Sequence, residues 1–271
     1  LATESTDAWN NAGTGHAGYC ELNYTPRQGN GEIAIERALR INARFEESLQ
    51  FWSGLVRKGA LSKPSAFINP VPHMSWVQGK DNVSYLKNRQ EALVSHPLFE
   101  EMEYADDPAT LEEWLPLIMA GRDMTQPMAA TRVAHGTDIN FGELTRSMGE
   151  HLSHEDSVDY WLSTLVTGLK KVGDCWHVTT RHALAGKRTI EARFVFVGAG
   201  GCALPLLQKA NVDEVRGYGG FPVSGIWLAS ENIKAATIHN AKVYGMPPVG
   251  APPISVPHLD TRVIEGRPAL L

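Results

Sequence analysis

Residues 9–26 form the segment that most restricts what this chain can fold into. Glycine occupies Gly13, Gly15 and Gly18, and the residues around them are mostly short and polar. Glycine lets a backbone approach a ligand closely and adopt positive φ, while Asn, Thr and His side chains hydrogen-bond to polar or anionic groups. The segment therefore predicts a loop that contacts a ligand. The alternative, from the residues alone, is a glycine-rich surface turn.

These three glycines also match the G-x-G-x-x-G fingerprint of dinucleotide-binding proteins, but their surroundings do not. The fingerprint follows an apolar strand and precedes, by about 20 residues, an acidic residue at the end of a second strand. Residues 4–10 are largely polar, and Glu32 and Glu36 begin an amphipathic pattern instead. The segment is thus not expected to open a dinucleotide-binding unit.

Composition excludes several classes of protein. A net charge of −5 argues against nucleic-acid binding. The three cysteines, Cys20, Cys175 and Cys202, form no C-x-x-C motif, which indicates reduced thiols in a cytosolic setting and predicts no metal site. The longest apolar stretch, residues 194–207, is interrupted by Gly and Pro and is too short to span a bilayer. No signal peptide is expected, and both ends read as cuts through a longer chain.

Hydrophobic periodicity predicts an α/β (α+β) chain. Helical spacing predicts helices over 31–58, from a cap at Asp81 or Asn82 to Pro97, over about 111–119, and from a cap at Asp138 or Asn140 to 152. Runs of strand type predict a β-meander at 158–171, 175–183 and 188–197, and an edge strand within 63–75. Further strands are expected at 221–228, 235–244 and 254–263.

A second glycine-rich turn, at 198–203, stands between the last strand of the meander and a helical segment at 204–209. Gly198, Gly200 and Ala203 spell G-x-G-x-x-A in a strand, turn and helix context. Taken alone it predicts an NAD site with Asp213 as a weak acidic partner. The alternative is that its glycines only let a helix pack closely on a strand.

Several blocks of sequence resemble the malate:quinone oxidoreductase family in the family's order. They are 10–26, 69–75, 121–123, 129–132, 136–146, 217–225, 242–245 and 249–262. The resemblance implies FAD as cofactor, with loop 10–26 against the flavin and the turn at 198–203 near the cofactor. The cofactor-binding residues it predicts are Asn11, Gly13, Thr14, Gly15, His16, Gly198, Gly200 and Gly201.

The same resemblance implies a fold and an activity. The fold is a partial FAD-binding domain (1–30 and 136–215) of the two-domain flavoprotein type, interleaved with a substrate domain of mixed sheet plus helices (31–135 and 216–271). The activity is oxidation of (S)-malate to oxaloacetate, with electrons passing through FAD to a membrane quinone. Such an enzyme would lie peripherally on the cytoplasmic face of the membrane.

Removing a hydride from a secondary alcohol requires a base for the hydroxyl proton and cations for the substrate carboxylates. His258, Asp260 and Arg262 fall on one face of an extended segment, so they can supply a base, an orienting carboxylate and a bidentate clamp. The alternative is a packed or solvated histidine beside a proline. His73 is the second candidate base, with a surface turn histidine as its alternative.

Arg122 and Arg132 are candidate cations for the two carboxylates of malate. Either can instead form a structural pair with Asp123 or Glu143. His151 and His154 resemble a metal pair only superficially, because no third ligand motif accompanies them. The absence of G-x-S-x-G removes the usual hydrolase interpretation.

Two other functions stay open from sequence. One is a flavin-dependent dehydrogenase or oxidase acting on another 2-hydroxy acid, and the other is a non-catalytic fragment of such an enzyme. The 271-residue chain by itself is expected to be inactive, colourless and prone to aggregate, because no strand, glycine-rich turn and helix for the FAD pyrophosphate precede Leu1.

Overall fold

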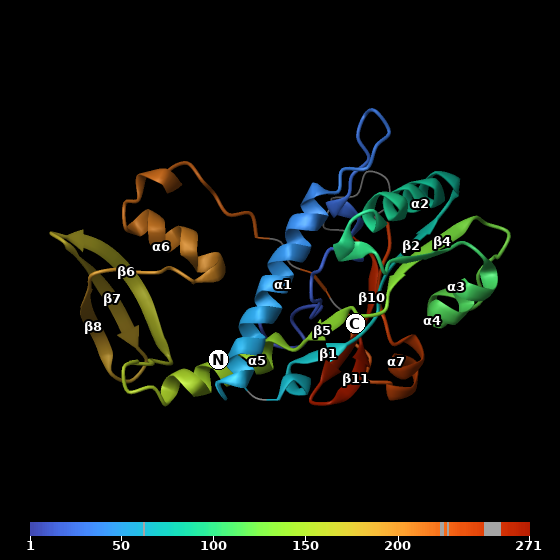
Figure 1. The fold of residues 1–271 in the computed structure, drawn as a ribbon. Helices are drawn as coiled ribbons and strands as arrows, with labels where there is room; N and C mark the ends of the chain where they lie inside the picture. The colour runs from blue at the N-terminus through green and yellow to red at the C-terminus, as the bar shows by residue number, and fades with distance from the viewer. Residues whose placement is uncertain (62, 223–224, 227, 247–255) are drawn as a thin grey trace. The chain divides into compact units, whose positions relative to one another are not determined.

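The computed structural model describes residues 1–61, 63–222, 225–226, 228–246 and 256–271. These residues form a mixed α/β structure, as the sequence predicts, and divide into two compact units (Figure 1). The larger unit contains Leu1–His154 and Trp227–Leu271, and the smaller contains Glu155–Ile226. The functional division into FAD-binding and substrate parts stays a prediction, and the compact units divide the chain at other residues.

A six-stranded mixed sheet forms the centre of the larger unit, in the order β11-β10-β9-β2-β4-β3. The strands are β2 (His73–Gln78), β3 (Glu103–Ala105), β4 (Met128–Val133), β9 (Lys242–Tyr244), β10 (His258–Ile264) and β11 (Arg267–Leu270). β2 and β9 pair in parallel, and the other neighbours pair antiparallel. A separate antiparallel pair joins β1 (Ile68–Pro70) to β5 (Thr137–Ile139).

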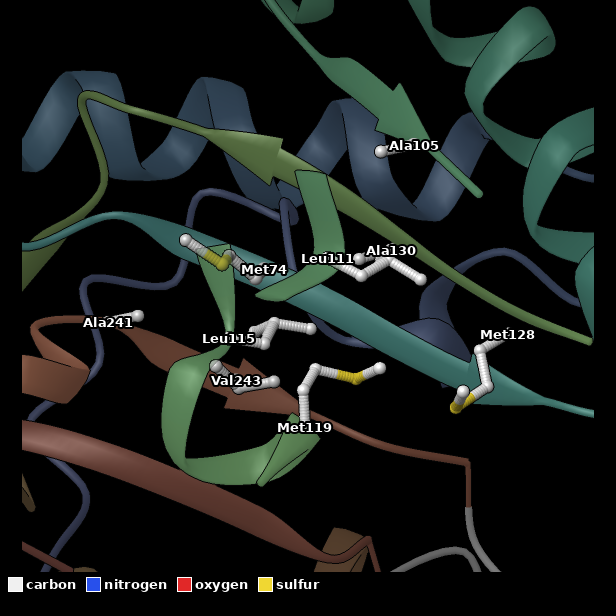
Figure 2. Close-up of a cluster of buried hydrophobic side chains, with 9 residues drawn as sticks. All are labelled: Met74, Ala105, Leu111, Leu115, Met119, Met128, Ala130, Ala241 and Val243. Atoms are coloured by element: carbon white, nitrogen blue, oxygen red, sulfur yellow. The ribbon is translucent and has the colours of Figure 1, made fainter. Parts of the chain in front are cut away.

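Apolar side chains lie on both faces of this sheet. Met74 of β2 packs in a cluster with Leu111, Leu115 and Met119, from the segment that contains α3 (Pro108–Trp114) and α4 (Pro116–Met119) (Figure 2). Val77, three residues along the same strand, packs with Leu86 of α2 (Lys80–Val94) in a different cluster. Successive side chains of a strand alternate between faces. β2 is therefore covered on both sides. The edge strand predicted within 63–75 is confirmed by β1, which belongs to the two-stranded pair with β5.

Two of the predicted helices are confirmed with small changes. α1 (Glu36–Arg57) buries Ala38 in a third cluster, and α5 (Phe141–Ser153) begins after Asn140, whose side chain accepts the N–H of Glu143 at 3.0 Å. The predicted caps of α2 are wrong, since the helix begins at Lys80 after Gly79.

The helix predicted at 111–119 is split in two. Pro116 lacks an N–H and restricts the residue before it, and Leu115 accordingly leaves the helical region at φ −128°, ψ 48°. Short 3₁₀ turns occur at Leu22–Tyr24, Pro64–Ala66, Pro97–Phe99, Gly200–Cys202 and Asp213–Val215.

The C-terminal strand predictions are partly wrong. Residues 235–244 contain a helix, α7 (Ile233–His239), before β9 begins at Lys242. Asn232 caps α7 by accepting the N–H of Ala235 at 3.1 Å, and Asn240 ends it in a left-handed conformation. The strand predicted at 254–263 is confirmed from His258 onward, and its first two residues lie outside the described part. The described residues of 221–228 form no strand. Val223, Ser224 and Trp227 lie outside the described part of the chain.

The smaller unit contains the predicted meander. β6 (Thr164–Val172), β7 (Cys175–His182) and β8 (Gly186–Ala192) pair antiparallel in that order, and α6 (Ala203–Lys209) contacts β6. The last strand ends at Ala192, earlier than predicted. Residues 193–197 belong to no strand of the described chain, and Phe194 and Phe196 are 79% and 85% exposed.

A buried carboxylate, that of Asp138, joins distant segments of the larger unit. Its Oδ1 accepts from Arg262 Nε at 2.8 Å and lies 2.9 Å from Lys242 Nζ, and its Oδ2 accepts the N–H of Val263 at 2.7 Å. The two cations also bond backbone carbonyls of other segments. Arg262 also donates to the carbonyls of Ala8, Asn11 and Ile139, and Lys242 donates to those of Ala12 and Thr261. All three charged side chains are fully buried.

We expect Asp138→Asn to destabilise the full-length protein strongly. The substitution keeps the shape of the side chain but leaves two buried cations without a counter-charge, a change that costs about 3–5 kcal/mol. The free energy of unfolding from urea titration measures this. Glu103→Gln is the matched control, because it removes an ion pair with Arg132 that is partly exposed and therefore contributes about 0–1 kcal/mol. Equal losses for the two variants would contradict the assignment.

Arg262→Lys distinguishes a structural role from a substrate clamp. Lysine cannot reproduce the planar fork that reaches Asp138 and the backbone carbonyls, so we expect a loss of stability of about 2–4 kcal/mol. Thermal melting measures this loss, and steady-state kinetics well below the melting temperature should show an unchanged KM for substrate. A variant that melts normally but binds substrate poorly would restore the clamp predicted from sequence.

Candidate functional site

The glycine-rich loop at 11–18 is held rigidly by the rest of the larger unit. Asn11 donates from Nδ2 to the carbonyls of Ser5 and Asp7, at 2.9 and 2.8 Å, and accepts the N–H of Gly13 at 2.9 Å. The N–H of Gly15 donates to the carbonyl of Thr137 at 3.0 Å. The loop thus has a fixed conformation that follows from contacts within the protein.

The loop glycines are required for close packing against protein atoms. A Cβ at Gly13, whose φ is +59°, would meet the guanidinium of Arg262, and one at Gly15 would meet Thr137 and Phe45. The contacts that the structure gives to Asn11, Gly13 and Gly15 are therefore with the chain itself. Their roles toward a cofactor stay predictions.

A row of side chains extends from this loop to β10. Thr14 Oγ1 lies 2.9 Å from the hydroxyl of Tyr244, and the Tyr244 ring stacks on His258 with centroids 4.7 Å apart. His258 Nδ1 lies 2.7 Å from Asp260 Oδ2. The row follows from strand geometry, because residues i and i+2 of β10 share a face and the β9–β10 register places Tyr244 opposite His258.

A pocket of about 380 Å³ opens beside this row. It is lined by His16, Glu21, Asn23, Tyr24, Arg37, Tyr244, Val256 and His258. Two of the residues predicted from sequence, His16 and His258, therefore meet in one cavity although they lie at opposite ends of the chain. His16 approaches the rings of Tyr24 and Tyr244 edge-on, at centroid distances of 6.1 and 6.3 Å.

Two polar groups of the pocket wall have pKa values shifted by their surroundings. Burial raises the pKa of the Tyr244 hydroxyl well above its usual value, and the buried Asp260 carboxylate adds to the effect. Desolvation against the wall lowers the pKa of His16, and the positive charge of Lys242 lowers it further. At neutral pH Tyr244 is therefore a neutral phenol and His16 a neutral imidazole.

His73, the second candidate base, does not line this pocket. It is buried in β2 and 1% exposed, and its Nε2 lies 2.9 Å from the backbone carbonyl of Thr137. Burial and the charge of Lys242 lower its pKa to about 3, so the ring is neutral. The geometry gives His73 a packing role between β2 and the segment 136–137.

None of the three candidate cations faces the pocket. Arg262 is buried with its nitrogens bonded to Asp138 and backbone carbonyls, and its role as a substrate clamp stays a prediction. Arg132 pairs with Glu103 at 3.1 Å rather than with Glu143. Arg122 donates from Nε to the carbonyl of Ile118 and stacks over Trp76 at 4.4 Å. Neither arginine forms the predicted structural pair with Asp123 or Glu143, and their roles toward substrate stay predictions.

The second glycine-rich turn lies in the smaller unit. Gly198, Gly200 and Gly201 are exposed, and Gly200 has a φ of +52°. A Cβ at Gly200 or Gly201 would meet no atom within 4 Å. These glycines are therefore not explained by packing of a helix on a strand, and the turn has an accessible backbone.

Sequence reasoning missed three important residues of the pocket. Tyr24 and Tyr244 stand in blocks that carry the family resemblance, so their presence there was a usable signal. Arg37 had no such signal. It follows Glu36 at the start of an amphipathic helix, where a charged residue is expected on any solvated face.

Comparison with known proteins places this geometry in a family. The family model for malate:quinone oxidoreductase (Mqo) matches residues 1–271. A probable malate:quinone oxidoreductase of Methylobacillus flagellatus is 58% identical over the whole chain, and one of Hahella chejuensis is 55% identical. In both cases the chain spans only 55% of the relative's length.

Solved structures show the same kind of fold at low sequence identity. L-α-glycerophosphate oxidase from Mycoplasma pneumoniae, solved with FAD bound, matches 100% of this chain and 61% of its own with a TM-score of 0.59 and 12% identity. L-proline dehydrogenase from P. horikoshii matches 83% of this chain and 53% of its own with a TM-score of 0.54 and 14% identity.

No helix in the described part of the chain combines the length and the apolar character needed to cross a membrane. The family match extends over every residue, and the relatives agree with it in name and at more than half of the aligned positions. This chain belongs to the malate:quinone oxidoreductase family.

Proposed function

We propose that the protein oxidises (S)-malate to oxaloacetate with FAD as cofactor and a quinone as electron acceptor. Family membership supports the substrate and the acceptor, and the bonded pair of His258 and Asp260 in an aromatic pocket carries the proposal chemically. The chain spans about half the length of its curated relatives, so this activity is proposed for the full-length protein.

The residues present fit the reactive end of a flavin. The pocket walls carry the rings of His16, Tyr24, Tyr244 and His258, which offer flat apolar faces and hydrogen-bonding edges to a planar heterocycle. In the smaller unit, the open backbone at Gly200 and Gly201 fits contact with a phosphate. FAD, when bound, supplies the acceptor for the two electrons removed from the alcohol.

His258 takes the role of general base. When its Nδ1–H donates to Asp260, Nε2 is the nitrogen that carries the lone pair and accepts the hydroxyl proton. The buried Asp260 carboxylate fixes this tautomer and stabilises the imidazolium that forms. Tyr244, stacked on the imidazole and bonded to Thr14, holds the ring in place.

The proposal extends to finer features that the resemblance implies. Electrons leave to a membrane quinone, and the enzyme lies peripherally on the cytoplasmic face of the membrane. Residues 1–30 and 136–215 contribute to FAD binding, and 31–135 and 216–271 to the substrate side. The pocket residues fall in both parts of this division.

Steady-state rates of the full-length protein with different donors and acceptors test the proposed function. We expect the largest kcat/KM with malate and a quinone analogue, and much lower values with 2-hydroxyglutarate or with oxygen. A preference for another 2-hydroxy acid, or for oxygen, would instead identify a related flavin-dependent dehydrogenase or oxidase. A full-length protein without flavin absorbance would contradict the cofactor.

His258→Gln in the full-length enzyme should lower kcat by about 10²-fold or more, because a positioned base contributes roughly 10²–10⁴. The flavin absorbance should be retained, since the substitution removes the base and keeps a side chain of similar size.

His135→Gln is the matched control. His135 is exposed, contacts Glu101 and Tyr19, and does not line the pocket. The His135→Gln variant should keep the wild-type kcat. A full rate for His258→Gln at saturating malate would remove His258 from the mechanism.

A further inference from the structure

Arg37 brings a positive charge to the pocket that contains His258. It is the second residue of α1, it is exposed, and its guanidinium carbon lies 4.9 Å from the centroid of the Tyr24 ring. No ion pair of Arg37 occurs among the described residues, whereas Arg132, Lys242 and Arg262 are each paired with a carboxylate. Its charge is therefore available to a ligand.

Arg37 and His258 stand at opposite ends of one row of rings. Arg37 lies over Tyr24, Tyr24 meets His16, His16 meets Tyr244, and Tyr244 stacks on His258. The residues of the row all line the same cavity. A ligand held in this cavity is therefore exposed both to His258 and to the charge of Arg37.

The other charged groups of the pocket do not replace Arg37. His16 is neutral at pH 7 because its pKa is lowered. Glu21 is an anion, and its Oε1 accepts the N–H of Asn23 at 3.1 Å, which occupies the carboxylate in a local turn. Among the described residues that line this pocket, Arg37 is therefore the one arginine or lysine.

We propose that Arg37 binds a carboxylate of the substrate. This inference rests on the proposed function. The guanidinium offers a planar fork that matches a carboxylate with two hydrogen bonds, and the face of Tyr24 fixes its plane. The N-terminus of α1 adds partial positive charge near the same position.

Arg37→Gln in the full-length enzyme tests the assignment. We expect kcat/KM for malate to fall by about 10- to 100-fold, in line with the loss of hydrogen bonds to a charged group. Binding of succinate, a dicarboxylate that lacks the reactive hydroxyl, should weaken by a similar factor in calorimetric titration. Arg37→Lys keeps the charge without the fork and should give intermediate values.

Arg40→Gln is the control, because Arg40 is an exposed arginine one turn further along α1 and does not line the pocket. It should match the wild type in kinetics, succinate affinity and melting temperature. Wild-type succinate affinity in Arg37→Gln would overturn the assignment.

Failure of the proposed function can be distinguished from failure of the Arg37 assignment. A wild-type enzyme that does not oxidise malate refutes that function, whereas succinate binding that depends on Arg37 in the same enzyme still supports the carboxylate site.

Discussion

Asp138 lies where β5, β9, β10 and the N-terminal loop meet, and its carboxylate is the contact that ties them together. It bonds Lys242 of β9, Arg262 of β10 and the backbone of Val263, while the two cations bond the carbonyls of Ala8, Asn11 and Ala12. Buried ions require partners because the protein interior replaces water poorly around a charge. The segments cannot separate without exposing or isolating a charge.

This requirement explains why the loop at 11–18 has its composition. Arg262 occupies the space beside Gly13, and Thr137 with Phe45 occupies the space beside Gly15, so a side chain at either position would displace the network or the core. With the loop fixed, Thr14 meets Tyr244 and His16 reaches the pocket. The position of His258 is then defined from two sides, by stacking on Tyr244 and by its bond to Asp260. The geometry of the site therefore depends on the buried ion pairs of Asp138.

The sequence predicted what local pattern controls. Helical spacing located α1 and α5, and the i, i+2 relation of His258 and Asp260 on an extended segment was sufficient to place them together. Prediction from sequence failed where contacts between distant segments determine the structure. The contacts of Arg262 with Asp138 and the N-terminal carbonyls could not be predicted from its local sequence. Residues 235–239 carry apolar side chains that suit a strand, but the Asn232 cap and the left-handed Asn240 make them helical. Arg37 enters the site only because Tyr24 and His16 are folded beside the start of α1.

The pocket also gives a physical meaning to the division predicted between a cofactor part and a substrate part. Under that division His16, Glu21, Asn23 and Tyr24 come from the FAD-binding segment 1–30, whereas Arg37, Tyr244 and His258 come from the substrate segments. The proposed base and the proposed carboxylate-binding cation then fall in the substrate segments, and the rings of His16 and Tyr24 fall in the cofactor segment. A reaction that moves a proton to the protein and a hydride to a flavin needs this separation, because the carbon must lie between the base and the acceptor. The buried bonds of Asp138 hold the two sides of the pocket in register, since they join the N-terminal loop to β9 and β10.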